Sequence, residues 1–162
     1  MKNKIYSLII VALFACNINS PNKIWEEANK MQESKKIKDS IILHKKIITN
    51  YPEHKYAVQS QFTIAEIYLN DVKEYEIAIE EFNNVITNYP QSSYAMNSLF
   101  MIAYIYNNYL NAYSNAIEAY NLFLSKYPNE ELIPSVRYEL NGLKKYEQQI
   151  DSLNNILKQN NI

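Results

Sequence analysis

The chain has 162 residues, 48% of them hydrophobic, with one glycine, five prolines and 15 tyrosines. This length suits one domain, and the scarcity of glycine and proline favours helices over sheet-rich or loop-rich folds. The formal net charge of −1 argues against nucleic-acid binding, since the strongest basic cluster is only Lys35-Lys36-Ile37-Lys38.

Residues 1–15 are organised as a secretory leader. Two lysines, Lys2 and Lys4, precede an apolar run from Ile5 to Phe14 that is too short to cross a bilayer as a mature helix. The run stops near Cys16, the only cysteine, so no intramolecular disulfide can form.

The four residues Leu13-Phe14-Ala15-Cys16 resemble a lipobox, at which a dedicated peptidase cuts before a lipidated cysteine. The resemblance implies that acyl chains on Cys16 attach the mature protein to a membrane; an ordinary thiol inside the leader is the alternative. Residues 16–22 would then form the lipidated cysteine and a tether that reaches about 20 Å. Asn17 is not the acidic residue that retains some lipoproteins in the inner membrane, so we expect the outer membrane, facing the periplasm.

Residues 23–50 are expected to form a first, degenerate helix pair. Its two small residues, Ala28 and Ser40, lie 12 positions apart, so its turn should be tighter than the later ones. His44 should be a partly buried packing residue rather than a metal ligand, because no other histidine, cysteine or carboxylate cluster accompanies it.

The dipeptide Tyr-Pro recurs every 38 residues, at Tyr51-Pro52, Tyr89-Pro90 and Tyr127-Pro128. The segments 51–88 and 89–126 align without a gap, and their apolar residues step by three and four, so each predicts two amphipathic helices. The polar run 70–74 is expected to separate the two helices of the first segment. Tyr-Pro should end each second helix, and the proline should start the next helix.

Small and aromatic residues recur at fixed positions in both segments. They are Ala65, Tyr68, Ala78, Phe82 and Pro90, then Ala103, Tyr106, Ala116, Tyr120 and Pro128. The pattern resembles the tetratricopeptide repeat (TPR), which implies an all-α, superhelical solenoid of antiparallel helix pairs in which the alanines permit close helix crossings. The period exceeds the usual TPR length of roughly 34 residues, since each inter-helix turn carries one extra residue and the first helix is longer. This longer form resembles the TPR lipoproteins of the Gram-negative envelope, above all the β-barrel assembly lipoprotein (BamD) family.

The C-terminal part is expected to close the array of repeats. Residues 127–142 form a partial repeat, with Asn141 where an alanine is expected, and residues 143–162 form a capping helix. Its apolar stripe comprises Leu143, Tyr146, Ile150, Leu153 and Leu157. The stripe either covers the last repeat or forms a coiled-coil dimer arm.

No group of residues predicts catalysis. A nucleophile with its base, paired carboxylates in a pocket and metal ligands at workable spacing are all missing, and the one glycine, Gly142, excludes a phosphate-binding loop. We therefore expect no enzyme, no cofactor, no metal site and no small-molecule substrate.

The TPR resemblance implies a concave inner face lined by the first helices, on which partner segments usually lie. The inner-face residues are Gln59, Phe62, Glu66, Leu69 and Asn70, then Asn97, Phe100, Tyr104, Asn107 and Asn108. This set is aromatic at its base and amide-rich at its rim, and it contains no lysine or arginine, so it suits an extended backbone better than an acidic terminus. The alternative is that these positions are the solvated faces of a spacer.

The BamD resemblance implies a non-enzymatic, lipid-anchored periplasmic scaffold that binds other envelope proteins, or extended segments of them, during outer-membrane protein assembly. The chain carries about three and a half units, fewer than that family has, so not every contact of the family carries over. An adaptor of the Tol-Pal type in cell division is the alternative, although that family is normally soluble and carries an N-terminal coiled coil.

Overall fold

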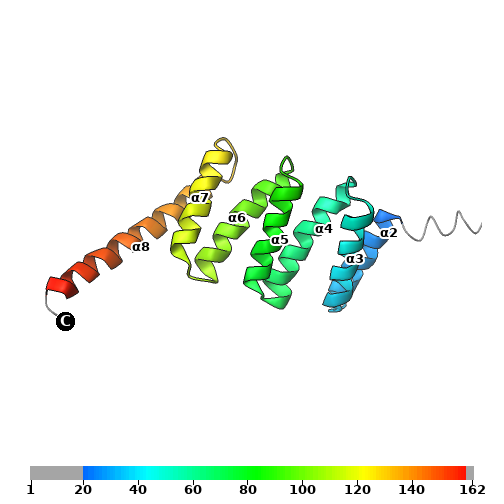
Figure 1. The fold of residues 1–162 in the computed structure, drawn as a ribbon, viewed down its shortest axis with the longest axis horizontal. Helices are drawn as coiled ribbons and strands as arrows, with labels where there is room; N and C mark the ends of the chain where they lie inside the picture. Colours follow the sequence, from blue (N-terminus) through cyan, green and yellow to red (C-terminus); the bar gives the residue numbers. More distant parts are fainter. Residues whose placement is uncertain (1–19, 160–162) are drawn as a thin grey trace, which may run out of the picture. The chain divides into compact units, whose positions relative to one another are not determined.

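The computed structural model describes residues 20–159, which are α-helical and contain no strand. The leader, Cys16 and most of the predicted tether lie outside the described residues. The helices are α2 (Pro21–Glu33), α3 (Ile37–Asn50), α4 (Lys55–Ile67), the π-helical turn η1 (Tyr68–Val72), α5 (Tyr75–Asn88), α6 (Ser93–Asn108), α7 (Tyr113–Lys126) and α8 (Ile133–Gln159) (Figure 1). They form two compact units, with a boundary between Val85 and Ile86, near the end of α5.

The first helix begins earlier than the sequence analysis placed it. Ser20 has an extended backbone and its hydroxyl accepts a hydrogen bond from the Lys23 amide at 3.5 Å, while Pro21 occupies the first helical turn. Proline is favoured there because its missing N–H would have no partner in that turn. Residues 21 and 22 therefore belong to α2, and the prediction that they are part of a tether is wrong.

Each second helix ends where the Tyr-Pro dipeptide begins. The last residues of α3, α5 and α7 are Asn50, Asn88 and Lys126, each directly before the tyrosine, which confirms that prediction. The prediction that the proline starts the next helix is wrong. Pro52, Pro90 and Pro128 are exposed and lie in short turns, and α4 and α6 start three residues after their prolines. Side chains provide the caps: His54 accepts from the Tyr56 amide at 3.2 Å, and Ser92 from the Ala95 amide at 3.2 Å.

The turns that end the first helices contain the extra residue of the long repeat. In the first pair, the Lys36 amide donates to the Met31 carbonyl at 2.8 Å, across six residues. In the next two pairs the equivalent bonds span seven residues, from Glu74 to Tyr68 and from Ala112 to Tyr106, both at 2.9 Å. The first turn is thus one residue tighter, as the spacing of its small residues predicts. In each turn, the residue before the one whose amide donates this hydrogen bond has a positive φ. The φ angles are 60° at Lys35, 64° at Lys73 and 52° at Asn111.

The helix continues further into the turn after α4 than predicted. Residues 70–72 belong to the π-helical turn η1, so only Lys73 and Glu74 separate it from α5. A π turn accommodates an additional residue without breaking the helix, because its hydrogen bonds run from residue i to residue i+5. The prediction of a five-residue polar separator is therefore wrong.

The core of the first unit lies between α2, α3, α4 and α5. It is mostly apolar, and its buried polar side chains are Ser40, His44, Ser60 and Gln61; His44 Nδ1 lies 3.1 Å from Ser60 Oγ. His44 is fully buried rather than partly buried, and its ring meets Trp25 edge-on at 5.1 Å. The largest fully buried apolar side chains of this unit are Phe82, Ile47, Ile64, Ile67 and Val85.

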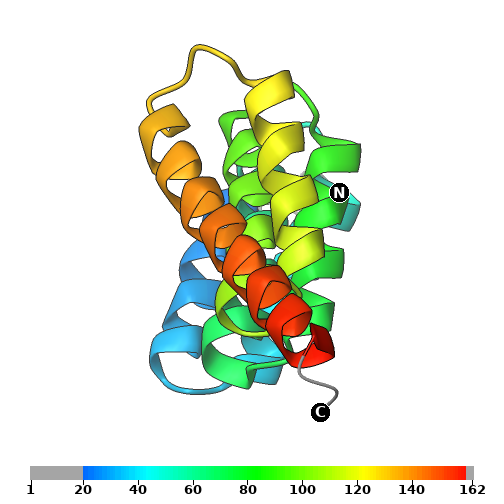
Figure 2. The same ribbon diagram turned by 90° about the vertical axis from the view of Figure 1, so that its left-hand side faces the viewer.

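The core of the second unit lies between α6, α7 and the start of α8. Tyr120 and Phe123 of α7 are fully buried and contact the ring of Phe100 on α6, at centroid distances of 6.1 and 6.4 Å. α8 contributes three buried residues at helical spacing, Val136, Leu140 and Leu143. Burial of these three side chains holds the beginning of α8 against α7. The two helices lie side by side there (Figure 2).

α8 is one continuous helix through residues 142 and 143, where the sequence analysis placed a border. Only its first half covers the last repeat. From Lys144 onward every described residue is exposed, and the apolar positions Ile150, Leu153 and Leu157 are 40%, 53% and 40% accessible. The far end of α8 extends past α7 (Figure 1), and its apolar positions from Ile150 onward are exposed, whereas Leu143 is buried and Tyr146 still contacts Tyr113 of α7.

Candidate partner-binding surface

In the first unit, four of the five predicted inner-face residues are accessible. Gln59, Phe62 and Glu66 on α4 are half-buried, and Asn70 in η1 is exposed. The ring of Phe62 packs edge-on against Phe82 at a centroid distance of 5.2 Å. Phe62 therefore supports the core while part of its ring still reaches the surface.

Leu69 does not belong to this surface. It is 4% exposed and lies in the core, so it cannot contact a partner, and its assignment to the inner face is wrong. The physical reason is the π-helical turn. Residues within η1 are rotated relative to an α-helix, because a π turn contains more residues than an α turn.

In the second unit, all five predicted residues are accessible. Asn97, Phe100, Tyr104 and Asn107 are half-buried and Asn108 is exposed. The rings of Phe100 and Tyr104 are stacked at 6.5 Å, and Tyr104 also meets Tyr109 edge-on at 6.0 Å. Half-buried rings of this kind combine a rigid position with accessible apolar area, which is the property of residues that anchor protein interfaces.

One acidic residue joins this surface from α8. The side-chain amide of Asn107 donates to the Glu139 carboxylate at 3.1 Å. Burial raises the pKa of the Tyr120 hydroxyl, and the nearby Glu139 and Tyr104 raise it further. The sequence analysis missed Glu139, although it precedes Leu143 by four residues and so lies on the helix face that packs on the last repeat.

A second carboxyl group lies on the first unit. Glu66 on α4 is half-buried, and burial raises its pKa. No cation lies within 4.0 Å of it among the residues that the structure describes, whereas Glu81 pairs with Lys45 at 3.9 Å. The accessible face of each unit therefore carries a carboxyl group without a cationic partner within 4.0 Å in the described part of the chain.

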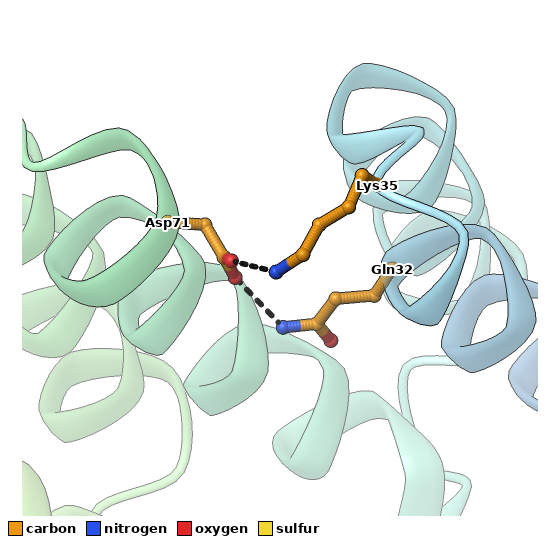
Figure 3. Close-up of polar contacts among 3 residues, drawn as sticks. All are labelled: Gln32, Lys35 and Asp71. Carbon is orange, nitrogen blue, oxygen red and sulfur yellow. Dashed lines mark hydrogen bonds and ion pairs between the residues drawn. The ribbon is translucent and has the colours of Figure 1, made fainter.

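Polar contacts also join the ends of α2 and η1. Asp71 accepts from the Gln32 side-chain amide at 3.1 Å and from the Lys35 ammonium group at 3.3 Å (Figure 3). The Asp71 side chain is 19% exposed and that of Lys35 is 79% exposed. An ion pair with one exposed member contributes little to stability, so these contacts mainly orient the two helix ends.

The residues assigned to repeat packing fall into two groups. The four alanines, together with Phe82 and Tyr120, are fully buried, whereas Tyr68 and Tyr106 are half-buried and Pro90 and Pro128 are exposed. The alanines are Ala65, Ala78, Ala103 and Ala116. Full burial of an alanine is what a close helix crossing requires.

Comparisons with known proteins identify the repeats. Residues 59–92 and 97–130 match the family model described as tetratricopeptide repeat, and the two matches start 38 residues apart, like the Tyr-Pro dipeptides. A search of curated protein sequences gives no significant match.

Similar solved structures show the same fold. Two structures of MamA AMB-1 have TM-scores of 0.57 and 0.53 at 16% identity; the matches cover 99% and 88% of this chain and 84% and 78% of theirs. A MamA mutant has a TM-score of 0.55 at 18% identity, with 91% and 76% covered. At these identities the likeness establishes the fold alone, which is all-α and TPR-like.

The TPR architecture is that of a protein-interaction scaffold, since TPR helix pairs present surfaces to partner proteins. Within residues 20–159, no helix has the length and apolar character needed to cross a membrane. No three side chains of histidine, cysteine, aspartate or glutamate come together as a metal site in the same range.

Proposed function

We propose that this protein is a non-enzymatic, lipid-anchored scaffold of the bacterial envelope that binds extended segments of partner proteins on its first helices. The stacked, half-buried pair Phe100 and Tyr104 on α6 is the observation that carries the proposal. Asn97, Asn107 and Asn108 lie on the same helix, and their accessible side-chain amides can hydrogen-bond to the backbone of an extended segment. Asn107 also donates to Glu139 and Asn108 to the Tyr104 carbonyl, which leaves each amide its second N–H and its oxygen.

The proposed setting is outer-membrane protein assembly, with the scaffold anchored through Cys16 and facing the periplasm. Its support is the sequence: the lipobox-like Leu13-Phe14-Ala15-Cys16 and the long TPR period resemble BamD-type lipoproteins. A short tether between Cys16 and α2, which begins at Pro21, would keep the first repeat close to the lipid surface. In this role the protein would hold partner subunits near the machinery that inserts β-barrels.

Replacement of the aromatic pair tests the proposal. Tagged protein is captured from solubilised envelopes, and the proteins that accompany it are identified by mass spectrometry. Tyr104→Ser and the double change Phe100→Thr with Tyr104→Ser should remove the partner set of the wild type, because buried aromatic anchors contribute about 2 kcal/mol or more each to an interface.

Two controls are needed for this experiment. Phe100 contacts Tyr120 and Phe123 in the core, so the double variant must retain wild-type circular dichroism, and the single change Tyr104→Ser leaves those contacts in place. Glu80 and Asn83 are exposed on α5 and provide the matched comparison. If folded Tyr104 variants keep every partner while Glu80→Gln and Asn83→Ser lose them, the scaffold binds through its second helices and the proposal is wrong.

A further inference from the structure

Two grooves lie beside α8 in the second unit. The first has a volume of about 610 Å³, and its walls are formed by Asn107 of α6, Tyr113 of α7 and one face of α8. The α8 residues on this face include Tyr138, Glu139, Gly142, Lys145 and Tyr146. Its volume lies in the range of about 300–1,000 Å³ that is typical of binding sites.

The second groove has a volume of about 550 Å³ and lies between the start of α7 and the middle of α8. Glu147 and Asp151 line it from α8. Both grooves include Tyr113 and Tyr146, whose rings meet edge-on at 5.1 Å. The two grooves therefore adjoin at this tyrosine pair, and together they are called the α8 grooves.

Charge is segregated on α8. All three of its carboxylates, those of Glu139, Glu147 and Asp151, line the α8 grooves. Of its four basic side chains only Lys145 does so, and Arg137, Lys144 and Lys158 lie elsewhere on the helix. None of the three carboxylates forms an ion pair within 4.0 Å in the part of the chain that the structure describes. The grooves thus carry an excess of negative charge that the unit itself does not neutralise.

Exposed tyrosine rings accompany these carboxylates. Tyr138 is 79% exposed and Tyr146 is 45% exposed. They precede and follow Gly142 by four residues, so both lie on its face of the helix. Cations are attracted to the faces of aromatic rings, and a guanidinium group also stacks on them.

Gly142 lies between the two rings and leaves the groove open. A glycine in the middle of a helix is about 1 kcal/mol less favourable than alanine. No packing contact explains it, since a Cβ atom at this position would have no other atom within 4 Å. The missing side chain leaves open space above the helix at this position.

From these observations we propose that the α8 grooves bind an extended, lysine- and arginine-bearing segment of a partner protein. The carboxylates of Glu139, Glu147 and Asp151 pair with its basic groups, and the stems and heads of those side chains lie against Tyr138 and Tyr146. The chain passes over Gly142, where no side chain obstructs it. This inference rests on the proposed scaffold function and specifies the chemistry of one class of partner segment.

Peptide binding to the detergent-solubilised full-length protein tests the inference. Fluorescence anisotropy is measured with a labelled peptide of alternating arginine and alanine, and with a second peptide in which glutamate replaces arginine. The basic peptide should bind, the acidic peptide should not, and affinity should fall as salt rises above about 0.15 M because the pairs are partly exposed. Equal binding of both peptides, or no binding of the basic one, would overturn the inference.

A matched pair of variants distinguishes the effect of the groove carboxylates on peptide binding from the effect of the protein's net charge. The triple variant Glu139→Gln, Glu147→Gln, Asp151→Asn should bind the basic peptide at least about tenfold more weakly. The control Glu118→Gln, Glu130→Gln, Glu131→Gln changes the charge equally at exposed positions outside the grooves and should stay within about twofold of the wild type. If the control loses as much affinity as the triple variant, binding is unspecific and the inference fails.

Gly142→Leu provides a test that does not change the charge. Because nothing lies near the added Cβ, the variant should fold at least as stably as the wild type, while its side chain fills the groove and weakens peptide binding about tenfold. Unchanged peptide affinity in a folded Gly142→Leu protein would show that the segment does not pass over this position. If only the α8 inference is wrong, the wild-type protein should still capture partners that depend on Tyr104. Failure of the α8 inference can therefore be told apart from failure of the proposed scaffold function.

Discussion

The His44 imidazole and the Ser60 hydroxyl form a buried polar pair in the first unit, with Nδ1 and Oγ 3.1 Å apart. Both residues are fully buried, and Nε2 on the other side of the ring has no hydrogen-bond partner. His44 occupies the position that Phe82 and Tyr120 hold 38 and 76 residues later in the chain. Burial lowers the pKa of His44 from 6.5 to about 4, because the core does not solvate an imidazolium ion.

This lowered pKa predicts a loss of stability in mild acid. Between pH 6.5 and 4 the unfolded chain binds a proton at His44 and the folded chain does not, so stability falls as pH falls through this window. At pH 5 the free energy of unfolding should be about 2 kcal/mol lower than at pH 7 from this residue alone. Urea unfolding at the two pH values measures the difference.

The variant His44→Phe isolates this effect from other titrating groups. The raised pKa of Glu66 has the opposite sign, since protonation of that carboxyl favours the folded state, and it is present in both proteins. The loss of stability between pH 7 and 5 should shrink in His44→Phe and persist in Ser60→Ala, which keeps the imidazole. An identical pH profile for wild type and His44→Phe would contradict the assignment.

The buried alanines predict sensitivity to larger side chains. Ala103 is fully buried in α6, so Ala103→Leu should overpack its surroundings and lower the free energy of unfolding by about 1–3 kcal/mol. The same side chain introduced by Asn121→Leu, at an exposed position of α7, should have little effect. Thermal melts of both variants decide the point, and a harmless Ala103→Leu would mean that the repeat register is wrong.

The left-handed residues at the ends of the first helices predict a stabilising change. Lys73 has a φ of 64°, a conformation that costs side chains other than glycine about 1 kcal/mol, so Lys73→Gly should raise the free energy of unfolding by about 0.5–1 kcal/mol. Asn111 has the equivalent position and a φ of 52°, but asparagine tolerates this region, so Asn111→Gly should gain less. Denaturant titration of both variants measures the gain in the free energy of unfolding. Equal gains for Lys73→Gly and Asn111→Gly would contradict the explanation by backbone strain.

Much of this fold could be predicted because the packing repeats. Burial of Ala65, Phe82, Ala103 and Tyr120 follows from their recurrence at helical spacing, and the Tyr-Pro dipeptides correctly locate the ends of the second helices. The start of α2 could also have been found, since Ser20-Pro21 is a capping residue followed by a first-turn proline.

The parts that were missed depend on geometry that residue spacing does not record. Leu69 enters the core because η1 adopts π-helical hydrogen bonding, whereas an α-helical projection places it outside. Glu139 joins Asn107 because the beginning of α8 packs on the last repeat; its spacing of four from Leu143 places it on the packed face, but the contact with Asn107 depends on how α8 lies against α6. The acidic character of the α8 grooves likewise depends on how α8 lies against α6 and α7.

The exposed half of α8 predicts that its removal is tolerated. Deletion of residues 149–162 should leave the melting temperature nearly unchanged, because the described residues there are all exposed. Sedimentation velocity of both proteins tests the alternative role of the stripe. A wild-type dimer that becomes a monomer and melts lower after the deletion would show that the stripe is a coiled-coil arm.

The final prediction concerns the anchor at Cys16. If the lipobox-like segment Leu13-Phe14-Ala15-Cys16 is processed, the mature protein begins at a lipidated Cys16 and sediments with membranes. Each buried methylene group contributes about 0.8 kcal/mol, so two or more acyl chains make the attachment stable.

Intact-mass analysis and membrane fractionation of wild type and Cys16→Ser measure this directly. Cys16→Ser should accumulate as uncleaved precursor or appear in the soluble fraction, since it cannot receive the lipid. The repeats should still fold, because Cys16 precedes α2, which starts at Pro21. A wild-type mass that corresponds to a free thiol, or to cleavage at another residue, would refute the anchor while leaving the TPR scaffold and the surfaces on α6 and α8 as they are.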